Sequence, residues 1–253
     1  MQVRSVADVL RVMWRKGAAL IALQFICASA MLGAGCGSGA SRSHAIGARE
    51  QAVGLANAIN LRQADVPGLA GRFERDREAR SGPLGNCDEA SAGGLIGFLS
   101  QRFGRGGTTV LPSESVSSAV YLMASETQAR RELAALGSSR ARACIQHDVE
   151  RSIKQGERER TEPFLATPVE VRPLAPLPGA LLVAGMRRIA RLAKASPFAA
   201  GRSKFYLDQC GFVVGRVLVN LLAVASPRPF PTVTERRLLA LLHSRATEAH
   251  KLS

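Results

Sequence analysis

The first 35 residues form a segment that is not expected to be part of the folded domain. Residues 1–16 hold four basic residues and one acid, and residues 18–32 carry no charge and are mostly apolar. A basic start, an apolar run and an exit of small residues are the parts of a secretory signal. The run is shorter than the roughly 20 apolar residues that a membrane-spanning helix needs. We therefore predict a signal peptide over residues 1–35 and a body that folds outside the cytoplasm.

The small-residue exit of this signal leads directly to a cysteine. Cys36 follows Gly33-Ala34-Gly35, and this arrangement resembles the lipobox of bacterial lipoproteins, in which such a cysteine receives a diacylglycerol. The family pattern prefers Leu, Val or Ile three places before the cysteine, where this chain has Gly33. We predict lipidation of Cys36, with two alternatives: cleavage after Ala30, which would give a secreted protein, and an uncleaved anchor.

Three parts of the chain follow from this assignment. Residues 1–35 are the lipoprotein signal peptide, and residues 36–48, which are small and polar without an apolar period, are a flexible tether. Residues 49–253 are expected to form a single extracytoplasmic domain. Its predicted location is the outer face of the cell membrane, where the lipid anchor makes the membrane its first partner.

Five cysteines are present, and export changes what each can do. Cys27 leaves with the signal peptide and Cys36 takes lipid, so three remain in an oxidising compartment. We favour a disulfide between Cys87, in a Gly/Asn-rich loop, and Cys144, in a predicted helix. Closing that loop would stabilise the fold by about 4 kcal/mol in the chain-entropy model. Cys210 lies in an apolar strand and would then be a free, buried thiol, although the sequence leaves this open.

The net charge of +14 suggests nucleic acid as a partner, but its distribution argues against that class. Removing 4 basic and 1 acidic residues with the leader from totals of 34 and 20 leaves 30 and 19, a net +11. These charges are spread over the whole chain, whereas nucleic-acid binders concentrate them with stacking aromatics or a recognition helix. We predict no nucleic-acid partner and some attraction to an anionic membrane surface.

Apolar periodicity and turn residues predict the elements of the body. Ser125-x-x-Gln128 and Thr232-x-x-Glu235 are typical of capping boxes, each opening a helix. Residues 180–194 fit a helix by their apolar spacing, although a strand is tolerated there. The expected elements are helices at 49–58, 125–137, 140–154 and from 232, and strands at 59–62, 116–123, 164–172, 205–207 and 212–224.

These elements do not alternate as strand and helix at regular spacing. The predicted fold class is therefore α+β, an antiparallel sheet flanked by helices, rather than a doubly wound parallel sheet. The run at 212–224 is almost continuously apolar, which places it in the centre of the sheet.

Several segments together resemble a known group of proteins. They are residues 58–62 and 65–68, residues 116–125 with the helix that contains Cys144, residues 205–208 and 211–215, and the Glu235 helix that ends near Ala246. This set resembles uncharacterised actinobacterial lipoproteins and, more remotely, PsbP-like domains and the extracellular sensor-like domain of PknH. The resemblance spans most of residues 50–250. It implies an antiparallel sheet with residues 180–194 largely in strand, and a binding, sensing or accessory role without catalytic residues.

The motifs of common catalytic and metal sites are missing from the sequence. No GxSxG or CxxC spacing occurs, and His147 and Asp148, adjacent on a helix, point apart. The loop at 104–107 lacks the Lys-Ser/Thr of a phosphate-binding loop. We therefore predict no catalytic residues, no metal and no cofactor.

The function predicted from the sequence is non-catalytic. The chain is expected to be a lipid-anchored protein of the cell envelope with a binding or sensor-like domain, whose ligand or protein partner is unknown. Two alternatives stay open: a secreted hydrolase with an unrecognised site, distinguished by a cleft lined with Ser, His and carboxylates, and a structural envelope protein without a pocket.

Overall fold

The computed structural model describes residues 39–71, 77–79, 82–87, 96–106, 113–158, 165–174, 183–192 and 204–252. The signal peptide and Cys36 lie outside these residues, so their assignment stays a prediction. By its internal contacts the chain divides into Met1–Glu50 and Gln51–Ser253. One helix, Gly39–Ile59, begins in the first unit, and every other described element lies in the second.

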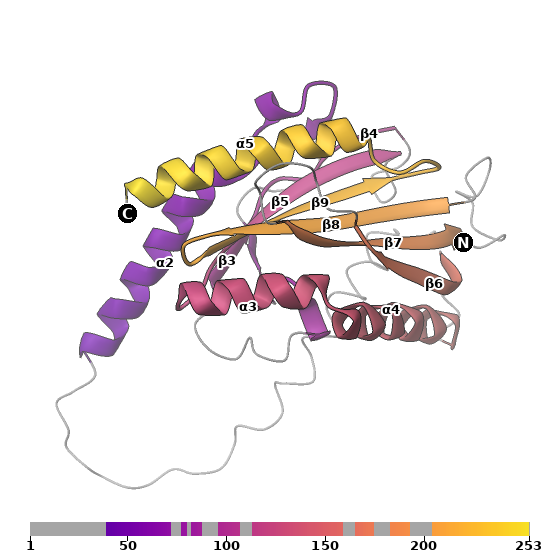
Figure 1. Ribbon diagram of the computed structural model, residues 1–253, viewed down its shortest axis with the longest axis horizontal. Coiled ribbons are helices and arrows are strands. Elements are labelled where there is room, and N and C mark those ends of the chain that lie inside the picture. The colour runs from indigo at the N-terminus through magenta and orange to yellow at the C-terminus, as the bar shows by residue number, and fades with distance from the viewer. Residues whose placement is uncertain are drawn as a thin grey trace, which may run out of the picture. The chain divides into compact units, whose positions relative to one another are not determined.

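A nine-stranded antiparallel sheet forms the centre of the described part of the chain (Figure 1). The path β1-β4-β5-β9-β8-β7-β6 orders seven strands, and β3 joins β2 to β5. The strands are β1 (Ala70–Gly71), β2 (Arg77–Ala79), β3 (Ile96–Leu99), β4 (Phe103–Arg105), β5 (Glu114–Leu122), β6 (Leu165–Pro173), β7 (Ala184–Leu192), β8 (Lys204–Val214) and β9 (Val217–Ala225).

Helices cover both faces of this sheet, which confirms the predicted α+β class. Helix α5 (Thr232–Lys251) packs on β8 and β9, whereas α3 (Glu126–Gly137) and α4 (Ser139–Arg158) pack on the opposite face (Figure 1). On the α5 face, a large apolar cluster unites this helix, the sheet and the C-terminal half of α2 (Gly39–Ile59). Fully buried members of that cluster include Ile59, Phe103, Phe212, Leu238 and Leu242.

The start of the domain differs from the prediction. Helix α2 runs from Gly39 to Ile59, so it includes residues 39–48 of the expected tether. It ends on the first residue of the expected strand at 59–62, and residues 60–62 form no strand. No proline interrupts this stretch, and a helix whose last turns pack Leu55 and Ile59 in the core can continue backwards through Ala- and Ser-rich sequence. Alternation over four residues cannot distinguish a short strand from a helix end.

The structure also decides two segments of the sheet, one that the sequence left open and one that it predicted as a single strand. Residues 184–192 form strand β7, as the resemblance implies and against their helical spacing. The apolar run at 212–224 is divided by a turn at Gly215. The φ of this glycine is 55°, a backbone conformation that residues with a side chain rarely adopt. The first residues of the run therefore belong to β8 and pair with β9 across a tight hairpin. A continuous apolar run hid this turn because both strands are central in the sheet.

The predicted disulfide and one predicted helix cap are present. Cys87 and Cys144 form a disulfide with a Cα–Cα distance of 5.9 Å, linking the short 3₁₀ turn at Gly85–Cys87 to α4. Ser125 caps α3, since its Oγ accepts a hydrogen bond from the Gln128 amide at 3.1 Å. Cys210 is a free and buried cysteine of β8.

Candidate functional site

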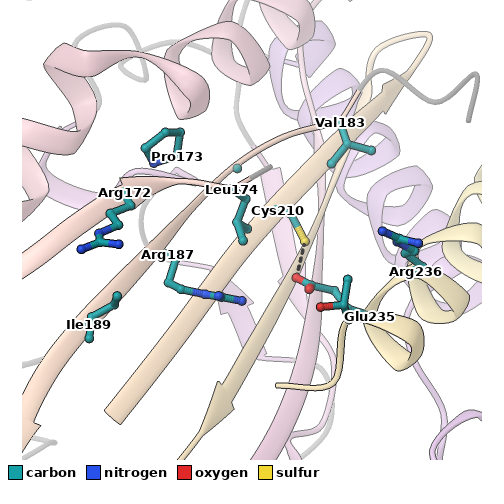
Figure 2. A pocket seen from close by; sticks show the side chains of 11 residues that line it. Arg172, Pro173, Leu174, Val183, Arg187, Ile189, Cys210, Glu235 and Arg236 are labelled. Carbon is teal, nitrogen blue, oxygen red and sulfur yellow. Dashed lines mark hydrogen bonds between the residues drawn. The ribbon is translucent and has the colours of Figure 1, made fainter. Parts of the chain in front are cut away.

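A hollow of about 320 Å³ opens on the sheet beside the first turn of α5 (Figure 2). It lies on the α5 face, where β6, β7 and β8 extend past the helix. Its walls combine three arginines, one carboxyl and one thiol with aliphatic side chains. The lining residues are Arg172, Pro173, Leu174, Val183, Gly185, Arg187, Ile189, Cys210, Thr232, Glu235 and Arg236.

The strand register explains how these side chains gather on one face. Gly185 pairs with Cys210, and Arg187 pairs with Asp208, across β7 and β8. Paired residues of neighbouring strands point to the same face, as do residues two apart on one strand. A Cβ atom at Gly185 would lie 2.7 Å from the Gln209 carbonyl oxygen and 2.9 Å from the Cys210 Cβ. The glycine therefore lets β7 approach β8 closely under the hollow.

Arg187 is held by a completely buried carboxylate. Its Nε donates to Oδ1 of Asp208 at 2.6 Å, and its Nη2 donates to Oδ2 at 2.7 Å. Asp208 is 0% exposed, whereas the Arg187 side chain is 24% exposed. These hydrogen bonds raise the pKa of Arg187 above its usual range. A two-point ion pair of this kind fixes the guanidinium plane as well as its charge.

Glu235 and Cys210 form the second polar pair of the site. The Cys210 thiol donates to Oε1 of Glu235 at 3.3 Å, the contact drawn as a dashed line in Figure 2. Glu235 is 3% exposed. The prediction that it closes a capping box is therefore wrong: α5 begins after Pro231 without a side-chain cap. The physical reason is that Thr232 already lies inside the helix, so Glu235 turns towards the sheet.

Burial controls the charge states of this pair. Burial raises the pKa of Glu235, and the nearby Asp208 raises it further, while Cys210, Arg187 and Arg236 act in the opposite direction. Burial also raises the pKa of Cys210 well above its usual range, as do Glu235 and Asp208. A thiol that keeps its proton is a poor nucleophile. The site therefore presents hydrogen-bonding groups rather than an activated sulfur.

The residues that sequence reasoning singled out for chemistry lie elsewhere. His147 is exposed on α4 and lies 3.0 Å from Nη2 of Arg151. Among the residues whose placement is described, no three His, Cys, Asp or Glu side chains gather as a metal site requires. In the same parts of the chain, no helix is long and apolar enough to cross a membrane.

Sequence reasoning missed Arg187, Asp208 and Glu235. A lone acid in a mainly apolar strand, such as Asp208 in β8, is the signal that points to a buried partner. Naming that partner requires the β7–β8 register, which the ambiguous spacing of residues 180–194 concealed.

Comparisons with known proteins give remote structural similarity and no match in sequence. No protein-family model matches the chain, and no curated protein matches it in sequence. Among solved structures it is similar to the extracellular domain of PknH from Mycobacterium tuberculosis, with 10% sequence identity and a TM-score of 0.41. That alignment covers 79% of this chain and 96% of the other. Because the similarity is remote, the site must be interpreted from its own residues.

Proposed function

We propose that this protein is a lipid-anchored binding protein of the cell envelope, whose non-catalytic domain takes a small ligand in the hollow between β6, β7, β8 and α5. The observation that carries the proposal is the hollow itself. Aliphatic walls with a few fixed polar groups are what small-molecule sites consist of, and about 320 Å³ lies within their usual size range. The disulfide between Cys87 and Cys144 agrees with a body that folds outside the cytoplasm.

The chemistry of the site favours binding over hydrolysis. A hydrolase needs a nucleophile with a base that takes its proton. The thiol of Cys210 lines the hollow and is a potential nucleophile, but burial raises its pKa, so its proton is retained. Asp208, the nearest fully buried carboxylate, is occupied by both hydrogen bonds from Arg187. Neither group is arranged to activate water or attack a substrate.

Filling the hollow tests the binding proposal. A panel of amino acids, short-chain acids, amines and monosaccharides at millimolar concentration is added to the protein, and the methyl NMR signals of Leu174, Val183 and Ile189 are followed. We expect at least one probe to shift these signals in the native protein, and to leave those of Val183 and Ile189 unshifted in Leu174→Trp, whose indole occupies the space. Val233→Trp is the matched control, because Val233 is 80% exposed on the same helix that borders the hollow. Shifts that persist in Leu174→Trp, or no shift with any probe, would refute the proposal.

Lipid labelling tests the anchor separately. Cells expressing the full chain are grown with labelled palmitate, and the protein is recovered from the membrane fraction. We expect label in the native protein and none in Cys36→Ala, because the thiol is the acceptor of the diacylglycerol. Cys210→Ala is the control, since that thiol is buried in β8. Label retained in Cys36→Ala would show that the anchor is elsewhere.

A further inference from the structure

We infer that the hollow selects a small zwitterion with an apolar body, of which an aliphatic α-amino acid is the simplest example. The ligand's carboxylate binds the free edge of Arg187, and its ammonium group binds Glu235. This inference rests on the proposed binding function and adds the chemical class of the ligand to it. Figure 2 shows Arg187 and Glu235 extending from opposite sides into the same space.

Arg187 supplies the carboxylate subsite. A guanidinium has five N–H donors, and the bonds to Asp208 use one on Nε and one on Nη2. The edge formed by Nη1 and the second N–H of Nη2 is left for a ligand, and the side chain is 24% exposed. Because Asp208 fixes the guanidinium plane, a carboxylate can bind this edge at two points without reordering the side chain.

Glu235 supplies the ammonium subsite. Its carboxyl is almost fully buried, and within the described parts of the chain its one polar contact is with the weak thiol donor of Cys210. Among the described residues, no lysine or arginine nitrogen lies within ion-pair distance of it. A buried carboxylate needs strong donors or a cation to offset its desolvation. A ligand ammonium group in the hollow provides both.

The charges around the hollow favour a ligand that is neutral overall. Arg187 and Asp208 neutralise each other, and Arg172 pairs with Glu170. Glu235 faces Asp208 and Cys210 on β8, Arg187 on β7 and Arg236 on its own helix. A simple carboxylate would bring a third negative charge next to two buried ones. A simple amine would leave the prepared edge of Arg187 without an acceptor. A zwitterion satisfies both groups and adds no net charge.

The apolar body of the ligand has its own place. Leu174, Val183 and Ile189 line the hollow with aliphatic surface. The volume of about 320 Å³ accommodates an amino acid with a branched side chain. Burying such a side chain against these residues contributes affinity, whereas the two charged subsites contribute orientation.

Three matched probes test this inference by calorimetric titration of the full-length protein. L-leucine carries both charges, 4-methylpentanoate lacks the ammonium group, and 3-methylbutylamine lacks the carboxylate. We expect leucine to bind at least tenfold more tightly than either of the others. Equal or tighter binding of the acid or of the amine would overturn the inference while leaving the binding function intact. If none of the three probes binds although another member of the NMR panel shifts the methyl signals of the hollow, the inferred zwitterion is also wrong. If no compound shifts those signals, the proposed binding function itself is refuted.

Variants assign each charge to its subsite. Glu235→Gln removes the negative charge but keeps the shape, so leucine affinity should fall at least tenfold while that of 4-methylpentanoate does not fall. Arg187→Lys keeps the charge opposite Asp208 but loses the planar edge, so leucine affinity should fall while that of 3-methylbutylamine is unchanged. Glu248→Gln is the matched control, because Glu248 is an exposed carboxylate on the same helix. Equal losses for all probes in a correctly folded Glu235→Gln would show a merely structural role and would refute the assignment.

Discussion

Helix α5 takes part in two buried carboxyl sites, and the hydrogen-bond partners of the two carboxyl groups differ. Near its C-terminal end, Arg245 donates to both carboxylate oxygens of Asp65, at 2.7 and 2.8 Å. The Arg62 amide adds a third hydrogen bond to Asp65 at 2.7 Å. In its first turn, the helix instead places its own Glu235 against the sheet, with a thiol as the hydrogen-bond partner. Both carboxyl groups are less than 10% exposed.

The two pKa values shift in opposite directions, and the partners explain why. Burial by itself raises the pKa of Asp65, but the hydrogen bonds from Arg245 and Arg62 outweigh it, so the net pKa is lowered. At Glu235 nothing of that strength offsets burial, and the pKa is raised. A carboxylate with a full set of donors supports the fold. A buried carboxyl group that lacks such donors and lies next to a hollow is a candidate binding group, because groups with shifted pKa values cluster at functional sites.

Removing the cation from the satisfied pair should produce the largest effect. Arg245→Ala leaves Asp65 buried without its two strongest donors, and we expect the free energy of unfolding at neutral pH to fall by about 3 kcal/mol. Urea denaturation monitored by circular dichroism measures this. Arg130→Ala is the control: Arg130 pairs with Glu126 on the exposed side of α3, where such pairs contribute about 0.5 kcal/mol or less. Equal losses in the two variants would mean that Asp65 is not a stabilising centre.

The unsatisfied carboxyl should respond in the opposite direction. Glu235→Gln removes a buried charge and keeps an acceptor for the Cys210 thiol, so we expect a gain of about 1 kcal/mol at neutral pH. The gain should disappear in acid, where native Glu235 carries a proton and resembles the amide. The same denaturation measured at pH 7 and pH 4.5 tests this. A loss of stability at pH 7 would show that ionised Glu235 has a strong partner in the folded protein.

The stability of the native protein should therefore depend on pH with two opposite contributions. The lowered pKa of Asp65 means that its contribution is present above the ordinary aspartate pKa and is lost as pH falls through the lower folded value. The raised pKa of Glu235 means that stability decreases as pH rises from the ordinary glutamate pKa through the higher folded value. Thermal unfolding as a function of pH should show a weaker acid loss in Asp65→Asn and a weaker decrease on the neutral side in Glu235→Gln. The assignments would be exchanged if each variant altered the other limb.

The difference between the two carboxyl sites also shows which features could be predicted from the sequence. Composition and apolar pattern predicted the α+β class, helix α3 with its Ser125 cap, and the pairing of Cys87 with Cys144, because those depend on local signals and on cysteine number. Glu235 was interpreted as a capping residue, since Thr232-x-x-Glu235 fits that local pattern. Its true partner, Cys210, is brought close only by the packing of α5 on β8. A site formed by residues of several neighbouring strands cannot be predicted from one segment at a time, because its geometry depends on the strand register.

The smallest expected effect concerns Cys210, which both borders the hollow and belongs to the core. The thiol is 2% exposed, and burial together with Glu235 and Asp208 raises its pKa, so the thiolate form that reacts with alkylating reagents is suppressed. We expect iodoacetamide at pH 8 to leave the native protein unmodified over hours, and to label Cys210 once urea unfolds it with the Cys87–Cys144 disulfide intact. Glu235→Gln removes one of the two negative charges near the sulfur but not its burial, so labelling of that variant should stay limited by unfolding. Rapid labelling of the native protein, at a rate that urea below the transition does not change, would show that reagent and base reach the sulfur through the hollow.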